Sequence, residues 1–379
     1  MGLTEPIFTT PRAYLKSREP DQPTFFFAPH ILAQTARRFQ RGFGGLVSYA
    51  IKANPDIAVL DNLLAAGITT FDVASLEEIR MVRARAPQAT LHYHNPVRSG
   101  REISGALQSG VRSFSIDRMS ELEKLAQMAQ GRPLEVSVRL KLPVKGAAYD
   151  FGTKFGATPD EAVELLQRVR DLGFTPSMTF HPGTQCKSAS AWQRYIDASA
   201  QVSHQAQTPL YRLNIGGGFP SHRNGQPPDL RAIFDMIRAA TAKAFAPNPP
   251  KLVCEPGRAM VAEAYSLATR IRAVDARGNI FLNDGIYGGL AEYPVIEATD
   301  RITALSQDGQ ILAGPTSPKT LFGPTCDSLD VLHSQHVLPD TLAEGDYLIF
   351  HGMGAYSCAL STRFNGYGQH KVVNLSKPS

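Results

Sequence analysis

Lys52 lies where an amine could do covalent chemistry. It follows the apolar run 47–51 and precedes Ala53, Asn54 and Pro55. Burial disfavours the charged form of an amine, and a neutral amine can form a Schiff base with an aldehyde. The alternative is a structural lysine whose aliphatic stem covers apolar surface while its ammonium group reaches water. The residue by itself leaves both interpretations open.

Other polar residues end other short apolar segments. Asp72, His94, Arg139, His181 and Glu255 each stand at or near the end of such a segment. If the segments are parallel strands, these side chains gather at the edge where catalytic groups of barrel enzymes lie. Each has a plainer explanation by itself: Asp72 could cap the next helix, and His94 could be a surface histidine. A purely structural explanation does not account for the whole set, so we expect a common site.

Three consecutive glycines, Gly216, Gly217 and Gly218, follow the segment 211–215. Without side chains in the way, their backbone amides can approach an anion closely. Gly257 and Arg258 would add further amides and a permanent cation. A triple glycine is often no more than a turn, but after a late strand of a barrel it predicts a phosphate site.

Glu255 gains a sharper role if that phosphate belongs to a pyridine cofactor. A carboxylate beside a pyridine nitrogen keeps the nitrogen protonated, which makes the ring an electron sink. The alternative is a strand-end carboxylate paired with Arg258. Lys52, the glycines 216–218 and Glu255 together match the aldehyde, phosphate and ring nitrogen of pyridoxal 5′-phosphate (PLP).

Eight short β-type segments alternate with helical patterns between residues 45 and 255. Ser75 and Glu78 have the spacing of a capping box, and Pro159 opens a helix. Eight alternating units predict an α/β fold with a closed parallel (β/α)8 barrel of the TIM type. The expected strands are 46–51, 69–73, 90–94, 111–115, 134–140, 176–181, 210–215 and 251–255, and the expected helices include 30–40, 75–86, 119–130 and 159–172.

The pattern changes after residue 260 to short strands and turns, expected at 261–274, 279–282, 301–307, 310–312 and 346–350. We therefore expect a cofactor-binding barrel over residues 25–260. A C-terminal all-β domain over residues 261–379, completed by residues 1–24, is expected to contribute to the active site and to a dimer interface.

Composition narrows the classes of function. Of 379 residues, 43% are hydrophobic and the net charge is +5, with no basic block that would indicate nucleic-acid binding. The four cysteines have no C-x-x-C spacing, so free thiols in a reducing cytoplasm are expected and no metal site is predicted. No stretch has the length of about 18 apolar residues that a membrane span needs, and no signal peptide is apparent.

Nine stretches of the chain match motifs of a known family in the family's order. They are 49–54 (YAIKAN), 71–75 (FDVAS), 154–156 (KFG), 180–184 (FHPGT), 214–220 (NIGGGFP), 255–258 (EPGR), 283–288 (NDGIYG), 323–327 (GPTCD) and 364–366 (FNG). The chain resembles the fold-type III PLP-dependent decarboxylases, the group of ornithine, lysine, arginine and diaminopimelate decarboxylases. The resemblance implies a carboxy-lyase that converts an L-amino acid to an amine and carbon dioxide.

The resemblance also implies roles for the barrel residues. Lys52 would carry PLP as a Schiff base, and Glu255 would pair with the pyridinium nitrogen. His181 would stack on the cofactor ring, while Asp72 and Arg139 would support the ring and the Schiff base. The phosphate would be held by Gly217, Gly218, Gly257, Arg258 and Tyr356, and by Thr184, which replaces the usual serine.

Cys326 and Asp327 would reach the active site from the partner subunit of a homodimer, so that a lone monomer would be inactive. Cys326 would protonate the α-carbon after carbon dioxide leaves, since a thiol can donate a proton if its pKa lies near the working pH. Without the resemblance, a buried structural thiol would be the better interpretation of Cys326.

The substrate is the least determined feature. Tyr287 and Asp327 are assigned to the substrate pocket, but the position of a distal-amine acid in ornithine decarboxylases falls on Val295 and Ile296. The nearby acids Glu292, Glu297 and Asp300 are candidates to replace it, and Pro182 is a second departure from the family pattern. We expect a basic or diamino acid such as ornithine or lysine, or a modified biosynthetic amino acid.

Two other functions remain open. An amino-acid racemase of related architecture would use a partner tyrosine where this chain offers Cys326 and Asp327. A non-catalytic PLP-binding or regulatory homologue tends to lose the lysine chemistry, whereas Lys52, Glu255 and Arg258 are all present.

Overall fold

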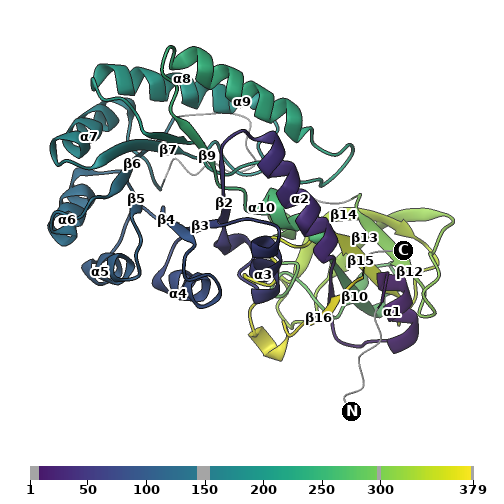
Figure 1. The fold of residues 1–379 in the computed structure, drawn as a ribbon. Helices are drawn as coiled ribbons and strands as arrows, with labels where there is room; N and C mark the ends of the chain where they lie inside the picture. The colour runs from purple at the N-terminus through teal and green to yellow at the C-terminus, as the bar shows by residue number, and fades with distance from the viewer. Residues whose placement is uncertain (1–7, 143–153, 297–299, 377–379) are drawn as a thin grey trace. The chain divides into compact units, whose positions relative to one another are not determined.

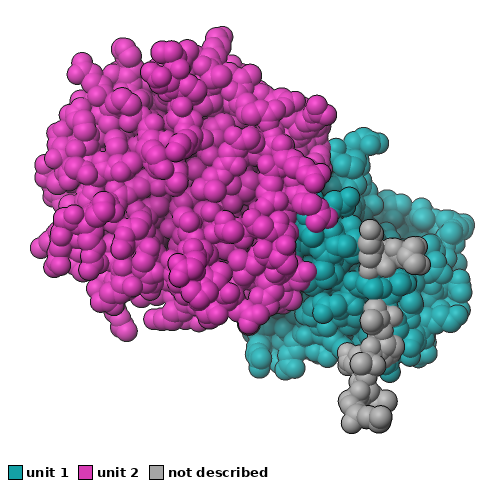
Figure 2. All heavy atoms as spheres, viewed as in Figure 1, with its two compact units in different colours: residues 1–34, 221–227, 261–379 teal, residues 35–220, 228–260 magenta. Residues whose placement is uncertain are grey.

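The computed structural model describes residues 8–142, 154–296 and 300–376. The chain forms two compact units (Figure 2). We call residues 35–220 and 228–260 the barrel unit, and residues 1–34, 221–227 and 261–379 the sheet unit. The expected boundaries fell at residues 24 and 260, whereas residues 25–34 and 221–227 cluster with the sheet unit.

Eight parallel strands of the barrel unit pair in chain order, and the last pairs with the first, so the barrel is closed. All eight overlap the segments predicted as strands, and the predicted fold class is confirmed. The register places Ala50 opposite Asp72. The strands are β2 (Leu46–Ala50), β3 (Thr70–Val73), β4 (Thr90–Tyr93), β5 (Ser113–Ile116), β6 (Glu135–Leu140), β7 (Thr175–Phe180), β8 (Arg212–Asn214) and β9 (Lys251–Cys254).

Helices connect successive strands and lie outside them (Figure 1). Thr158 begins its helix with a complete capping box to Glu161. The expected box at Ser75 is only half formed: Glu78 N–H donates to Ser75 Oγ, but the Glu78 carboxylate accepts from Ala74 N–H at 2.6 Å. The helices are α2 (Pro29–Gly42), α3 (Ile57–Ala65), α4 (Leu76–Arg85), α5 (Gly100–Gln108), α6 (Met119–Ala129), α7 (Pro159–Asp171), α8 (Ala189–Gln205), α9 (Leu230–Ala244) and α10 (Arg258–Val261).

The sheet unit is built on a mixed sheet of eight strands. Strand β1 pairs with β10 and β16, which ties the N-terminal segment to the end of the chain. The strands are β1 (Thr24–Phe27), β10 (Tyr265–Val274), β11 (Ile280–Leu282), β12 (Ile302–Leu305), β13 (Thr316–Phe322), β14 (Val331–Pro339), β15 (Tyr347–His351) and β16 (Lys371–Asn374), with the short helix α11 (Tyr293–Ile296).

Several expectations for this unit were wrong in detail. Residues 262–264 form a 3₁₀ turn rather than the start of a strand, and 310–312 contributes a single bridge at Ile311. Strands β13, β14 and β16 were not predicted; at β13, the prolines Pro315 and Pro318 were interpreted as part of a turn. Pro318 faces Val337 of β14, and β11 pairs with β13 only at Leu321 and Phe322, so the β11 side of β13 does not need the missing N–H of the proline.

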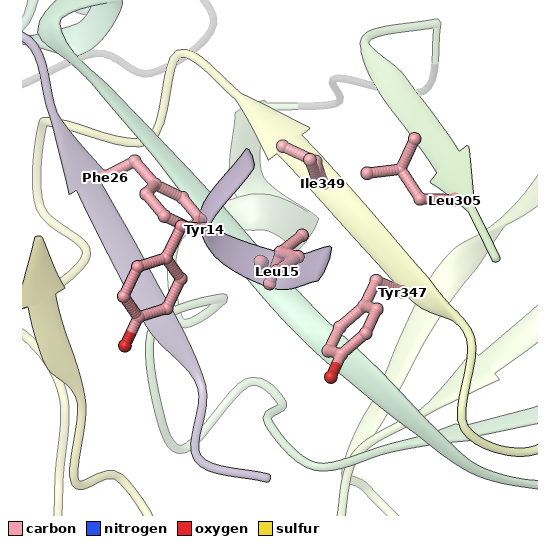
Figure 3. Packing of buried hydrophobic residues seen from close by; sticks show 7 residues of the cluster. Tyr14, Leu15, Phe26, Leu305, Tyr347 and Ile349 are labelled. Carbon is pink, nitrogen blue, oxygen red and sulfur yellow. The ribbon is translucent and has the colours of Figure 1, made fainter. Parts of the chain in front are cut away.

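Helix α1 (Pro11–Arg18) covers one face of this sheet with Tyr14 and Leu15 (Figure 3). The Tyr14 ring meets Phe26 of β1 edge to face, with centroids 5.5 Å apart. The cluster is completed by Ala268, Leu305, Tyr347 and Ile349. Burial of these side chains holds the N-terminal segment on the sheet. None of the helices in the described parts of the chain combines the length and hydropathy that a bilayer crossing requires.

Candidate active site

Side chains at the carboxyl ends of the barrel strands line a cavity of about 200 Å³. Six different strands bring them there, because parallel strands all end at the same rim. The polar residues singled out in the sequence meet at this one cavity: Lys52, Asp72, His94, Arg139, His181 and Glu255.

Lys52 is exposed, in contrast to the buried amine considered from the sequence. The chain leaves β2 in a single 3₁₀ turn, Ile51–Ala53, which buries Ile51 and Ala53 and leaves Lys52 exposed at the cavity. The ammonium group lies close enough to Asp72 and His181 to influence their ionisation. An exposed amine at the cavity is within reach of an aldehyde that enters it.

Two carboxyl groups near Lys52, those of the buried Asp72 and the half-buried Glu78, resist ionisation. Burial, followed by the charge of Glu255, raises the pKa of Asp72 to about 8. Burial also raises the pKa of Glu78, although its hydrogen bond from Ala74 opposes this effect. Among the described residues, none forms a hydrogen bond with Asp72 Oδ1. Because buried polar atoms of native proteins are nearly always satisfied, this atom indicates a ligand that belongs in the cavity.

Glu255 is held by two side chains that both contact Oε1. Asn214 Nδ2 donates to it at 2.6 Å, and His94 Nδ1 is within hydrogen-bond distance. Burial favours the neutral acid, but the charge and hydrogen bond of His94 outweigh burial and lower the pKa of Glu255 to about 2. Glu255 is therefore an ionised carboxylate in a largely buried place, as a partner of a pyridinium nitrogen must be. His94 is itself buried, so its interpretation as a surface histidine was wrong.

His181 is neutral in this cavity. The amide of Gly183 donates to His181 Nδ1 at 3.1 Å, so that nitrogen carries no proton. Burial, then the positive charges of Lys52 and Arg139, lower the pKa of His181 to about 3. A neutral imidazole can stack on an aromatic ring without the cost of burying a charge.

The Arg139 guanidinium lies 5.3 Å from the centre of the Phe155 ring.

The glycine run forms a tight backbone cradle. Gly218 has φ of +82°, and a Cβ there would lie 2.3 Å from Gly183 O. At Gly217 a Cβ would lie 2.8 Å from Glu255 O and 3.3 Å from His181 Nε2. Only glycine leaves room for a group beside these amides. The other predicted phosphate ligands of this unit are the half-buried Thr184 and the buried Gly257 and Arg258.

The sheet unit carries the predicted proton donor. Cys326 is exposed, not buried as a structural thiol would be, and it lines a second cavity of about 640 Å³. Asn365 Oδ1 accepts hydrogen bonds from both the backbone N–H and the thiol of Cys326, each at 3.2 Å. Asn365 adopts φ of +50°, a region that asparagine tolerates better than most residues.

Asp327 and Tyr287 form a pair beside Cys326. The Tyr287 hydroxyl donates to Asp327 Oδ2 at 2.5 Å. This hydrogen bond, with one from the Leu329 amide, lowers the pKa of Asp327, so the carboxylate is charged. The two predicted substrate residues are thus brought together, although 40 positions separate them in the chain.

The remaining predicted residues of the sheet unit are more dispersed. Tyr356 follows β15 and has φ of +57°, which is rare for a tyrosine and indicates a constrained backbone. Glu292 is half-buried directly before α11, and Glu297 lies outside the described residues. Asp300 Oδ2 accepts from the Gly225 amide at 2.6 Å.

Three residues of these sites were not assigned a role from the sequence: Glu78, Asn214 and Asn365. Asn214 and Asn365 stand inside motifs that were recognised, so their position was a usable signal. Glu78 was interpreted only as a capping residue. Nothing in the local sequence shows that α4 begins close enough to Lys52 for the two charges to interact.

The barrel cavity fits PLP in its donor set. It offers an accessible amine, an ionised buried carboxylate, a neutral imidazole, a glycine cradle and an unsatisfied carboxyl oxygen. These groups match the aldehyde, ring nitrogen, ring face, phosphate and phenolic side of the cofactor.

Comparison with known proteins agrees with this chemistry. Residues 30–262 match the family described as pyridoxal-dependent decarboxylase, pyridoxal binding domain. The lysine/ornithine decarboxylase of Selenomonas ruminantium is 33% identical over 331 residues, covering 85% of this chain and 81% of that protein. The arginine decarboxylase of Paramecium bursaria Chlorella virus has a TM-score of 0.86 at 26% identity, covering 96% of this chain and 98% of that one.

A third similar protein is the lysine/ornithine decarboxylase of Vibrio vulnificus, solved with putrescine. Its TM-score is 0.82 at 27% identity, and the match covers 96% of both chains. The family match covers the barrel unit, whereas the structural matches, at 96% of this chain, extend over the sheet unit as well. The chain belongs to the family of pyridoxal-dependent decarboxylases and is a PLP-dependent amino-acid decarboxylase.

Proposed function

We propose that the protein decarboxylates an L-amino acid with a basic side chain, in the class of lysine, ornithine and arginine. The observation that carries the proposal is the Asp327 carboxylate, which is held ionised by Tyr287 in the cavity that also contains Cys326. A carboxylate of depressed pKa attracts a distal ammonium or guanidinium group and repels a distal carboxylate. The names of the relatives agree with this class.

PLP supplies an electron sink conjugated to the substrate α-carbon when it is bound. In our proposal Lys52 holds the cofactor covalently and Glu255 keeps a proton on the pyridine nitrogen. His181 would pack on the ring face as a neutral imidazole, which adds no charge of its own to the site. The depressed pKa of Glu255 and of His181 supports both assignments.

Cys326 then delivers a proton from Sγ to the α-carbon. The Cys326 thiol donates a hydrogen bond to Asn365 Oδ1, which holds Sγ in a defined position before substrate arrives. A single well-placed donor protonates the α-carbon from one face, which gives a clean amine product.

We also propose a homodimer in which Cys326 and Asp327 complete the partner's barrel site. Exposed apolar side chains near these residues support an interface: Leu329 is 61% exposed and Phe364 44%. None of the four cysteines forms a disulfide, which suits a cytoplasmic enzyme.

The substrate class is tested by measuring carbon dioxide release from L-ornithine, L-lysine, L-arginine and meso-diaminopimelate. We expect turnover of at least one of the three basic amino acids and little of diaminopimelate, whose distal carboxylate meets Asp327. Asp327→Asn should weaken the preference for the basic substrates, with Ser328→Ala as a neighbouring control. Preferred turnover of diaminopimelate would contradict the proposal.

Complementation tests the shared site. Lys52→Ala and Cys326→Ala each disable one half of every site, so neither homodimer makes amine efficiently. If sites are shared, random mixing makes half of the dimers mixed, each with one intact site, and about a quarter of wild-type amine formation returns. No recovery in dimers that demonstrably exchange subunits would show that both residues act within one chain.

A further inference from the structure

His94 is a buried histidine that the reaction described above does not use. It follows β4 and contacts Glu255, the residue proposed for the pyridine nitrogen. The His94 ring also stacks on His92, with centroids 5.2 Å apart. A buried imidazole against a catalytic carboxylate can determine both the position and the charge of that carboxylate.

The backbone that carries His94 is locked from two sides. Ser115 Oγ donates to His94 O at 2.7 Å. The buried guanidinium of Arg98 donates to Ser115 O at 2.7 Å, to Tyr93 O at 3.3 Å, and to Asn95 O. These bonds join the ends of β4 and β5 directly around His94, so its ring has a defined place.

Asn214 contacts the same oxygen of Glu255 from β8, the strand next to β9. Gly216 N–H donates to Asn214 Oδ1 at 2.9 Å, which fixes the orientation of the amide and directs Nδ2 to Glu255 Oε1. His94 Nδ1 also meets Oε1. Two contacts on one oxygen fix the rotation of the carboxylate and leave Oε2 as the oxygen to face a ring nitrogen.

The charges around His94 favour a protonated imidazole. Burial opposes that form, but the charge and hydrogen bond of Glu255 raise the pKa of His94. The neighbouring His92 is neutral, since burial and the charge of His94 lower its pKa to about 3. His94 is therefore the cation that keeps Glu255 ionised in a buried place.

We propose that His94 is a positioning residue that holds the Glu255 carboxylate ionised and turned toward the pyridine nitrogen of PLP. The inference rests on the proposed role of Glu255. The donor atoms of His92, His94 and Glu255 also lie within 4.8 Å of one another, a spacing that suits a metal ion. The direct contact between His94 and Glu255 already satisfies the pair, so we assign the cluster to the cofactor.

The test compares two ligands of the cofactor-free protein: PLP, and its analogue with carbon in place of the ring nitrogen. Dissociation constants are measured by fluorescence or calorimetry, without substrate. His94→Ala should weaken PLP binding about tenfold or more, because the charged hydrogen bond between Glu255 and the ring nitrogen would be weakened. Binding of the carbon analogue, which cannot form that hydrogen bond, should stay within about twofold. A variant that only disturbs the local structure would weaken the binding of both ligands to the same extent.

His94→Asn keeps the test decisive if the alanine variant folds poorly. Asparagine Nδ2 superposes on histidine Nδ1, so this variant restores the donor without the charge and should recover part of the PLP affinity. Equal weakening of both ligands in both variants, or tighter PLP binding, would overturn the inference.

Glu255→Gln separates this inference from the proposed function. If Glu255→Gln abolishes the preference for PLP over the analogue but His94→Ala preserves it, His94 has no such role and the assignment of Glu255 stands. If Glu255→Gln leaves the preference intact, the assignment of Glu255 to the ring nitrogen fails, and the role of His94 fails with it.

Discussion

Asp72 of the cofactor site is expected to lower the folding stability of the cofactor-free protein by an amount that can be calculated. Its carboxyl group is buried, has an unsatisfied Oδ1 and faces the charges of Glu255, His94, Lys52 and Glu78. Replacing it by the isosteric amide in Asp72→Asn removes the ionisation and keeps the shape. We expect this variant to stabilise the cofactor-free protein and to weaken its binding of PLP.

The magnitude follows from the pKa in the two states. The carboxyl group has a pKa of about 8 in the folded protein and about 4 in the unfolded chain. Below pH 4 the carboxyl group is protonated in both states, so Asp72 causes no loss of folding stability. As pH rises from about 4 to 8, only the unfolded state ionises, so folding stability falls. At roughly 1.4 kcal/mol per tenfold change, the loss reaches about 4 kcal/mol at pH 7.

Urea or thermal unfolding of the cofactor-free wild type and Asp72→Asn at pH 5, 6, 7 and 8 measures this loss. We expect the advantage of the variant to grow with pH to about 1–4 kcal/mol, the lower value applying if water solvates the ionised carboxylate. Asp117→Asn is the matched control of opposite sign. Although burial opposes ionisation of Asp117, hydrogen bonds from Arg118 and Gly156 lower its pKa. This control should therefore destabilise at neutral pH and lose its effect as pH falls. Parallel stability curves for wild type and Asp72→Asn would refute the reasoning.

Three further predictions concern the site directly. Lys52→Ala should lose the cofactor mass that borohydride reduction attaches to the wild-type chain, as read by mass spectrometry; an unchanged labelled mass would remove Lys52 from the mechanism. Cys326→Ala should keep PLP but lose clean amine product, so an unchanged amine yield would exclude Cys326 as the proton donor. Gly218→Ala should weaken PLP binding at least tenfold, because the new Cβ lies 2.3 Å from Gly183 O. Gly173→Ala has a similar φ of +75° with nothing within 4 Å, so it should cost backbone strain without that loss of affinity.

The barrel was predictable because its signal is local. Each strand is a short apolar segment, and a polar residue at its end must point to the same rim as its counterparts on the other strands. That argument alone placed Asp72, His181 and Glu255 at one cavity, as the structure shows. The sheet unit was less predictable, because strands such as β13 are stabilised by distant partners, and Pro318 misled a local interpretation.

The amino-acid sequence by itself determined the barrel, the residue types at its rim and the family, since each depends on order and spacing along the chain. Only the tertiary structure decided the ionisation of those residues, because a pKa depends on burial and on charges from other strands. It made Asp72 hard to ionise and Glu255 easy to ionise, through the contact of His94 with Glu255 across 161 positions of the chain. It also left Lys52 exposed at the cavity, because the single 3₁₀ turn after β2 buries Ile51 and Ala53 instead.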